Sequence, residues 1–238
     1  MNVSRETPPW RIVIAGTGTE VGKTHVGVAL VAALAARGEP VCGMKPVESG
    51  IVANTWSDAD RLAQVSVVRA SEAPFRFEPA VSPHLAAREL GVSIELDQVL
   101  SWVGTQGASL EVIETAGALL SPLGRQLTNL DMIKALEGDG LILVGLDRLG
   151  ILHEVAACLL ALRTLAPELP LPVVVLNEPS QRDASTGINV GELQTLGLIQ
   201  DGVMMPRGAV DDRETRKATE KLIALLEASR RHHDAASA

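Results

Sequence analysis

The sequence predicts an α/β fold: a mostly parallel β-sheet with helices on both faces. Three observations predict it. Short runs rich in Val, Ile and Leu alternate with longer segments suited to helices, and such alternation is typical of a parallel sheet joined by helical crossovers. The runs are apolar throughout instead of at every second position, which indicates strands buried on both faces. A Gly-Lys-Thr sequence also lies between the first predicted strand and the first predicted helix.

The first half of the chain contains three predicted strands and three predicted helices. The apolar run 11–15 ends at Gly16, and the first helix ends before Gly38, which stands where a left-handed residue is favoured. Prolines at three positions predict a loop over residues 71–83. We expect strands at 11–15, 40–45 and 110–113, and helices at 22–37, 58–69 and 94–105.

The second half continues the alternation. Pro167 ends a long apolar-rich helix, and Pro172 and Pro179 flank the strand that follows. We expect strands at 141–146, 173–176 and 203–205, and helices at 127–136, 152–165 and 214–230. The whole chain, residues 1–238, is expected to form one domain with flexible ends at about 1–10 and 232–238.

Composition argues against some classes of partner and compartment. The formal net charge is −8 and no dense Lys/Arg run is present, so we expect no nucleic-acid partner. Aromatic platforms for stacked bases are scarce, with three Trp, two Phe and no Tyr. Cys42 and Cys158 lie far apart, which favours free thiols in a reducing compartment. The chain shows no signal peptide and no apolar run long enough for a membrane span, so a cytoplasmic location is expected.

A phosphate-binding loop is predicted at Gly16-Thr-Gly-Thr-Glu-Val-Gly-Lys-Thr24, between the first strand and the first helix. Glycines let backbone N–H groups turn toward phosphate oxygens, and the helix N-terminus adds partial positive charge. Lys23 is placed to reach the outer phosphates and the Thr24 hydroxyl to ligate Mg²⁺. The usual pattern has glycine where this chain has Thr17. The fold class is therefore that of the P-loop NTPases.

Two other P-loop classes fit less well. ATPases of the ParA and MinD type, which switch between protein partners, carry an additional lysine near the loop start, where this chain has Gly18. GTPases read guanine with an Asn-Lys-x-Asp motif, and the nearest sequence here is Asn177-Glu-Pro. ATP is therefore the expected nucleotide, while a partner-binding ATPase switch stays open as an alternative.

Several segments together resemble the dethiobiotin synthetases. The phosphate loop is similar to that family's loop, and the match extends from about Val13 to Pro206. The resembling segments are Met44-Lys-Pro-Val-Glu-Ser-Gly50, Trp56-Ser-Asp-Ala59, Val81-Ser-Pro-His84, Glu114-Thr-Ala-Gly-Ala-Leu-Leu-Ser-Pro122 and Leu149-Gly-Ile-Leu-His153. The chain departs from the family where the loop's usual Asp is Gly18, and where two usual glycines are Thr115 and Ala118. The side chains of Thr115 and Ala118 are expected where the family's backbone approaches phosphate closely.

The resemblance implies an ATP-dependent ligase that closes a cyclic urea on 7,8-diaminopelargonate with CO₂, giving dethiobiotin, ADP and phosphate. Lys45, Lys23 and Thr19 are the implied catalytic residues. Lys45, Thr19 and Ser49 are the implied contacts to the diamine or its carbamate. The family also implies a homodimer. A related amide ligase is a further alternative, although such enzymes usually carry an additional glutamine-hydrolysing domain.

Magnesium and nucleotide contacts are also expected. Thr24, Asp58 and Glu114 form the expected Mg²⁺ set, because Mg²⁺ prefers a few protein oxygens together with water and phosphate. Asn177 matches the family's adenine-reading residue, and its amide can pair with both N6 and N7 of the base. The residues expected to bind the nucleotide are Glu20, Val21, Gly22, Lys23, Thr24, His25, Glu114, Gly117, Asn177 and Pro206.

Overall fold

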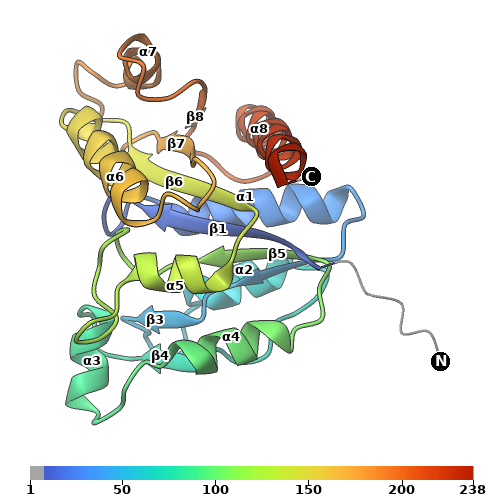
Figure 1. The fold of residues 1–238 in the computed structure, drawn as a ribbon, viewed down its shortest axis with the longest axis vertical. Coiled ribbons are helices and arrows are strands. Elements are labelled where there is room, and N and C mark those ends of the chain that lie inside the picture. The colour runs from blue at the N-terminus through green and yellow to red at the C-terminus, as the bar shows by residue number, and fades with distance from the viewer. Residues whose placement is uncertain (1–7, 238) are drawn as a thin grey trace.

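A computed structural model describes residues 8–237 and confirms the predicted α/β class (Figure 1). Its main sheet has six parallel strands in the order β2-β5-β1-β6-β7-β8. These strands are β1 Trp10–Gly16, β2 Val41–Met44, β5 Leu110–Glu114, β6 Gly140–Leu146, β7 Val173–Asn177 and β8 Gly202–Met205. Of the ends predicted to be flexible, about 1–10 and 232–238, residues 1–7 and 238 lie outside the described residues. Trp10 already belongs to β1, and residues 232–237 continue helix α8.

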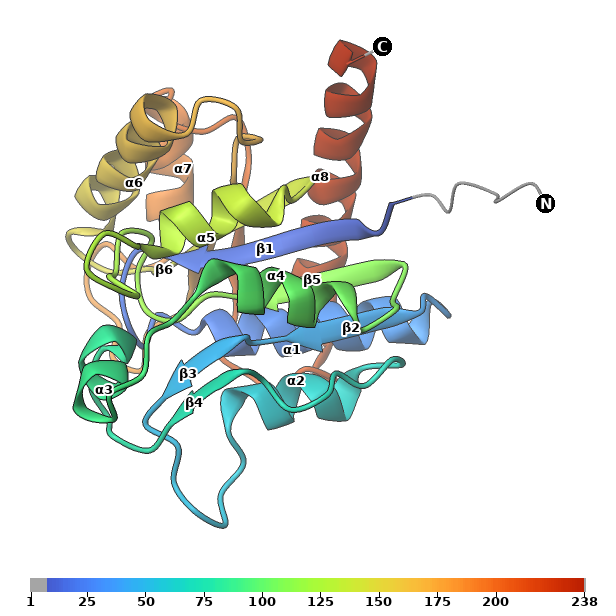
Figure 2. The ribbon, with the colours of Figure 1, turned by 60° about the horizontal axis from the view of Figure 1, so that its bottom comes forward.

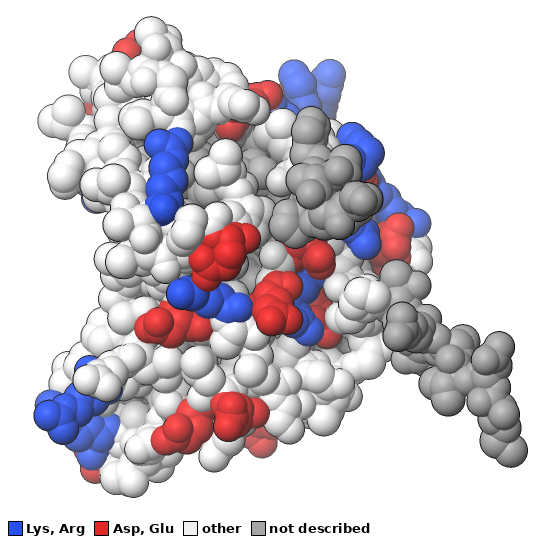
Figure 3. Space-filling model, in the orientation of Figure 1, with Lys and Arg blue, Asp and Glu red and all other residues white. Residues whose placement is uncertain are grey.

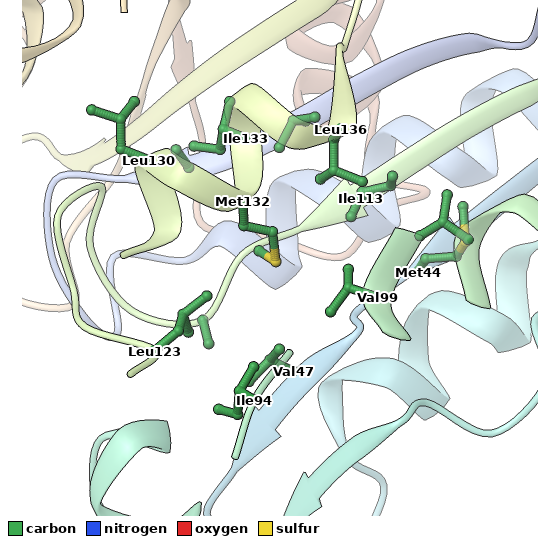
Figure 4. Packing of buried hydrophobic residues seen from close by; sticks show 14 of the residues in the cluster. Met44, Val47, Ile94, Val99, Ile113, Leu123, Leu130, Met132, Ile133 and Leu136 are labelled. Atoms are coloured by element: carbon green, nitrogen blue, oxygen red, sulfur yellow. The ribbon is translucent and has the colours of Figure 1, made fainter. Parts of the chain in front are cut away.

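Helices cover both faces of the sheet, as its apolar strands require. In β1, Ile12 and Ile14 pack with α1 and α8, whereas Val13 and Ala15 pack with α4 and α5. Figure 2 shows α1 and α5 on opposite sides of β1, and Figure 4 shows the packing under α4 and α5. The helices are α1 Lys23–Ala36, α2 Asp58–Val65, α3 Pro83–Glu89, α4 Leu96–Gly104, α5 Asn129–Leu136, α6 Ile151–Leu165, α7 Asn189–Thr195 and α8 Arg213–Ser237.

A second, two-stranded parallel sheet corrects the prediction of an unstructured loop over 71–83. Strand β4, Phe75–Phe77, lies inside that segment and pairs with β3, Val47–Ser49. Strands of three residues are too short to show a periodic pattern, and the buried rings of Phe75 and Phe77 hold β4 against the core instead. The short helices α3 and α7 were likewise not predicted.

Helix α2 ends at Val65, four residues before the predicted end at Arg69. Ser66 explains the difference because its hydroxyl donates to Leu62 O at 2.8 Å and accepts from the N–H of Gly43 at 2.9 Å. These bonds turn the chain toward β2 instead of continuing the helix. Gly38, in contrast, has the left-handed conformation that the sequence predicted, with φ +83°.

Candidate active site

The strand order brings three predicted segments together at the carboxyl edge of the sheet. Strands β2, β5 and β1 are neighbours, and all run parallel. Met44 lies opposite Ile113, so the following residues, Lys45 and Glu114, lie side by side. The phosphate loop follows β1 at the same edge. Ligands of open parallel sheets bind at this edge, which is where the arrowheads of β1 and β6 point in Figure 1.

The phosphate loop holds its shape through backbone conformations that limit the choice of residue. Gly22 has φ +86°, and a Cβ there would lie 2.4 Å from Asn177 Nδ2. Glu20 adopts φ +58° and is exposed. The ammonium of Lys23 donates to Gly18 O at 3.3 Å, so the lysine curls back over the loop. Burial lowers the pKa of Lys23 to about 8, although the Glu114 carboxylate opposes that change.

Lys45 lies between two carboxylates at the base of the cleft. Its Nζ is 2.7 Å from Glu114 Oε1 and 2.5 Å from Asp58 Oδ2. Burial alone would lower the pKa of Lys45, but Glu114 and Asp58 outweigh it and raise that pKa, so the ammonium stays charged. Burial raises the pKa of Glu114. Desolvation acts the same way on Asp58, but Lys45 outweighs it and lowers the pKa of that carboxyl.

The three expected magnesium ligands meet here. The Thr24 hydroxyl donates to Glu114 Oε1 at 3.0 Å, and Lys45 joins Glu114 to Asp58. Glu114 is 1% exposed and its Oε2 has no hydrogen-bond partner among the described residues. An unpaired buried carboxylate oxygen is costly, and a cation would satisfy it. The side chains described, residues 8–231, form no group of three His, Cys, Asp or Glu that could hold a metal ion by themselves. The hydroxyl and carboxylate donors of Thr24, Asp58 and Glu114 suit a hard ion that also takes phosphate oxygens.

The loop after β5 is fixed from inside the protein. Asn129, which the sequence analysis missed, is fully buried and donates its amide to Ala116 O and, at 2.8 Å, to Ala118 O. Gly117 has φ +79°, and a Cβ there would lie 2.8 Å from Ser121 Oγ. A capping box between Thr128 and Asp131 places Asn129 in the first turn of α5. This Thr-x-x-Asp pattern was the available sequence signal.

Thr115 corrects one expectation. Its side chain was expected beside the phosphates, but it is fully buried and its hydroxyl donates to Ile14 O at 3.1 Å. Because the hydroxyl is satisfied by strand β1, Thr115 does not project into the cleft. The Ala118 N–H donates to Ser121 Oγ at 2.9 Å, so this turn is held by a hydroxyl close to the cleft wall.

A cleft of about 620 Å³ contains the residues implied in substrate binding. Thr19 is exposed on one wall, and Ser49 on another donates its hydroxyl to Val81 O at 2.6 Å. This bond ties β3 to the segment before α3. The residues lining the cleft include Thr19, Glu20, Lys23, Thr24, Lys45, Ser49, Asp58, Glu114 and Gly117.

A second cleft, of about 380 Å³, contains the residues expected near the base. Asn177 Nδ2 donates to Val21 O at 2.7 Å and to Gly22 O at 3.1 Å, while its buried Oδ1 has no hydrogen-bond partner within the described part of the chain. The amide N–H groups are therefore already used, and Oδ1 is the group left to meet a base. The ring of His25 lies with Nε2 3.2 Å from Pro206 O, so both flank the same cleft.

Comparisons with known proteins identify the family. A family model described as an AAA domain matches residues 10–203. The ATP-dependent dethiobiotin synthetase BioD of Anaeromyxobacter dehalogenans (strain 2CP-C) is 37% identical over 201 residues, which cover 82% of this chain and 89% of that protein. The chain belongs to the dethiobiotin synthetase family. BioD of Caulobacter sp. (strain K31) is 38% identical, covering 70% of this chain and 75% of that protein. The dethiobiotin synthetases are ATP-dependent ligases of biotin biosynthesis, and this chain is accordingly an ATP-using P-loop ligase.

Solved structures agree on the fold of this dethiobiotin synthetase family member. Chloroplast FtsY from Physcomitrella patens is 15% identical with a TM-score of 0.53, covering 92% of this chain and 67% of that one. A ParA family ATPase from Chlorobium tepidum is 14% identical with a TM-score of 0.50, covering 94% of each chain. At such identities the likeness shows the fold alone. Across the described residues, no helix is long and apolar enough to cross a membrane.

Proposed function

We propose that this protein converts 7,8-diaminopelargonate, CO₂ and ATP to dethiobiotin, ADP and phosphate. The observation that carries the proposal is Lys45, a buried ammonium at the meeting point of the phosphate loop and the substrate cleft. The reaction needs a fixed positive charge there because carbamate and phosphoryl group are both anionic. The names of the relatives support this substrate.

The reaction starts with attack of one amine nitrogen on the carbon of CO₂, which gives a carbamate and releases a proton. A carbamate oxygen then attacks the γ-phosphorus of ATP, and ADP leaves. The second amine finally attacks the carbonyl carbon of this mixed anhydride, closes the ring and expels phosphate, with loss of a proton. Each step begins with attack by one group on another that the cleft holds beside it, so alignment supplies much of the rate.

The chain's own residues align and neutralise these groups. Lys45 contacts the carbamate and the transferring phosphoryl group, while Lys23 contacts the outer phosphates. Thr19 and Ser49, which both line the cleft, hydrogen-bond the diamine or its carbamate. The carboxylates of Glu114 and Asp58 hold Lys45 in place, since both lie within hydrogen-bonding distance of its ammonium.

Magnesium accompanies the nucleotide in this proposal. Thr24, Asp58 and Glu114 hold the ion, and the unpaired Oε2 of Glu114 is the supporting observation. When bound, the ion supplies positive charge that neutralises the phosphates. The base lies in the second cleft, where Asn177 Oδ1 accepts from the exocyclic amine of adenine. Selectivity for ATP follows, because guanine presents a carbonyl at that position.

The proposal extends to assembly and compartment. Two leucines at the start and on the outer side of α6, Leu149 and Leu160, are 76% and 66% exposed. Figure 3 shows that the surface over α6 and α7 is largely uncharged. Exposed leucines on a surface with few charges support a homodimer with a second copy of this chain. Cys42 and Cys158 are both free, which suits the reducing cytoplasm.

Release of ADP by the purified protein tests the proposal. Mg-ATP and bicarbonate are supplied with and without 7,8-diaminopelargonate, and the product mass is measured. ADP release that depends on the diamine, with formation of dethiobiotin, is the expected result. A protein that binds ATP but is not stimulated by the diamine contradicts the substrate and favours another amide ligase. Stimulation by a protein partner instead favours the ATPase switch.

A further inference from the structure

The first turn of α2 is held by two separate sets of contacts. Ser57 and Asp60 form a capping box, in which the Asp60 N–H donates to Ser57 Oγ at 3.2 Å and the Ser57 N–H donates to Asp60 Oδ2 at 3.0 Å. Separately, the N–H of Asp58 donates to Glu48 Oε1 at 2.7 Å. The capping box already stabilises the start of the helix. The Glu48 contact is additional, and it is made to the proposed metal ligand itself.

Stability of α2 does not account for a glutamate at this position. Glu48 is 4% exposed, and its Oε2 has no hydrogen-bond partner among the described residues. Burying a carboxylate with one oxygen unpaired costs free energy, whereas one more N–H at a helix start can be left to water. The position of Glu48 therefore indicates that the backbone of Asp58 has to be held in place.

The small sheet makes this contact rigid. Glu48 lies on β3, three residues after Lys45, and opposite Arg76 of β4. Arg76 Nη2 donates to Ser57 Oγ at 3.3 Å. The short segment from Lys45 to Glu48 therefore contacts Asp58 at two points. Lys45 binds the Asp58 carboxylate at 2.5 Å, and Glu48 accepts from the Asp58 backbone N–H. Arg76 braces the neighbouring residue from the second strand.

We propose that Glu48 is a positioning residue for the magnesium site, which fixes Asp58 through its backbone N–H so that the carboxylate meets the ion. The inference rests on the magnesium site of the proposed function. The hydrogen bond, and not the charge of Glu48, carries the effect. Partners that orient metal ligands typically change metal affinity by about 10- to 100-fold when they are removed.

Binding of Mn²⁺, used as a probe for Mg²⁺, tests the inference without turnover. Free Mn²⁺ is followed by electron paramagnetic resonance in the presence of ATP and the absence of diamine. Glu48→Met fills the same space without an acceptor and is expected to raise the Kd for Mn²⁺ about tenfold. Glu48→Gln keeps an acceptor for the Asp58 N–H and is expected to bind Mn²⁺ like the wild type.

Two further variants separate the possible outcomes. Ser57→Ala removes the capping box and the Arg76 contact but keeps the Glu48 bond to Asp58. It should therefore lower the melting temperature and raise the Kd for Mn²⁺ less than Glu48→Met does. Asp58→Ala removes the ligand and should weaken Mn²⁺ at least as much as Glu48→Met does. If Glu48→Met does not fold, Glu48→Asp serves, because its shorter side chain withdraws the acceptor from Asp58.

The outcomes distinguish the inference from the proposed function. Weak Mn²⁺ binding in Asp58→Ala with normal binding in Glu48→Met overturns the positioning role alone. Equal weakening in Glu48→Gln and Glu48→Met overturns it too, because charge then matters and the acceptor does not. Normal Mn²⁺ binding in Asp58→Ala overturns both the magnesium site and the inference. The proposed reaction is tested separately, by the formation of dethiobiotin.

Discussion

The two clefts at the carboxyl edge of the sheet recognise their ligands by different physical means. The cleft beside β2 and β5 is built from buried charge, with Lys45 between Glu114 and Asp58. In the cleft beside β7 and β8 the buried contacts are neutral: Asn177 braces the phosphate loop, and His25 meets the carbonyl of Pro206. The charged residues that line this cleft, Glu20, Glu178 and Arg207, are exposed or half-buried. Charge in a low-dielectric site interacts strongly, whereas a neutral hydrogen bond contributes little net energy.

This difference separates chemistry from selectivity. Substitutions in the charged cleft are expected to lower kcat, because phosphoryl transfer depends on charge neutralisation. Substitutions of the neutral groups in the cleft beside β7 and β8 are expected to raise KM for ATP and leave kcat nearly unchanged, since the base takes no part in the reaction.

The largest effect is expected for Lys45→Gln. The amide keeps hydrogen-bonding capacity but removes the positive charge, and Glu114 and Asp58 lose the ammonium that pairs with both of them. We expect kcat to fall roughly 100-fold, or ~2.7 kcal/mol of barrier. Steady-state ADP release with saturating diamine and ATP measures this. A variant that keeps the wild-type kcat contradicts the role assigned to Lys45.

Gly22→Ala tests the point where the two clefts meet. A Cβ at this position would lie 2.4 Å from Asn177 Nδ2, and φ is +86°. The left-handed conformation alone costs an alanine ~1–2 kcal/mol, so we expect weaker ATP binding and lower stability together. Calorimetric titration with ATP and a thermal melt measure them. In the Gly22→Ala/Asn177→Ala double variant the steric part of the loss in stability should be relieved. If Gly22→Ala lowers stability equally with and without the Asn177 side chain, the predicted clash with Asn177 is contradicted.

How much of the site could be predicted depends on the range of the interactions involved. Lys45, Glu114 and Asn177 each lie at the end of an apolar strand or directly after it. Parallel strands place such residues at one edge of the sheet, so their common edge could be predicted from the sequence. Glu48 and Asn129 are different: each is buried by packing against segments distant in sequence, and neither interrupts a local pattern. Strands β3 and β4 gave no periodic signal because each has only three residues.

Single departures from a motif were also hard to interpret from sequence. Thr115 stands where a glycine is usual, and its side chain was expected near phosphate. Its direction is set by Ile14 O, a carbonyl of another strand. Such long-range bonds decide where a side chain points, and the local sequence carries no sign of them.

Asn177→Ala is expected to have a moderate effect confined to ATP binding. The variant removes the acceptor for the base and the two bonds to Val21 O and Gly22 O. We expect KM for ATP to rise roughly tenfold, or about 1.4 kcal/mol, with kcat nearly unchanged. Comparison of ATP and GTP as substrates is the sharper measurement, because loss of Oδ1 should reduce the preference for ATP. A fall in kcat with unchanged KM would place Asn177 with the charged cleft.

The smallest effect is expected for the cysteines, which lie outside both clefts. Burial raises the pKa of Cys42 to about 12 and that of Cys158 to about 11. Catalytic thiols show the opposite shift, so Cys158→Ala should leave turnover unchanged.

A raised folded-state pKa stabilises the fold below the unfolded thiol pKa of about 8.5, and this contribution is lost as pH rises toward the folded value. At pH 8 Cys158 should react with iodoacetamide roughly 200-fold more slowly than a free cysteine, because a much smaller fraction of it is thiolate. Its rate should then rise about tenfold per pH unit until the pH approaches its pKa. Rapid alkylation of the folded protein at pH 8, followed by mass spectrometry, would contradict the burial that raises its pKa.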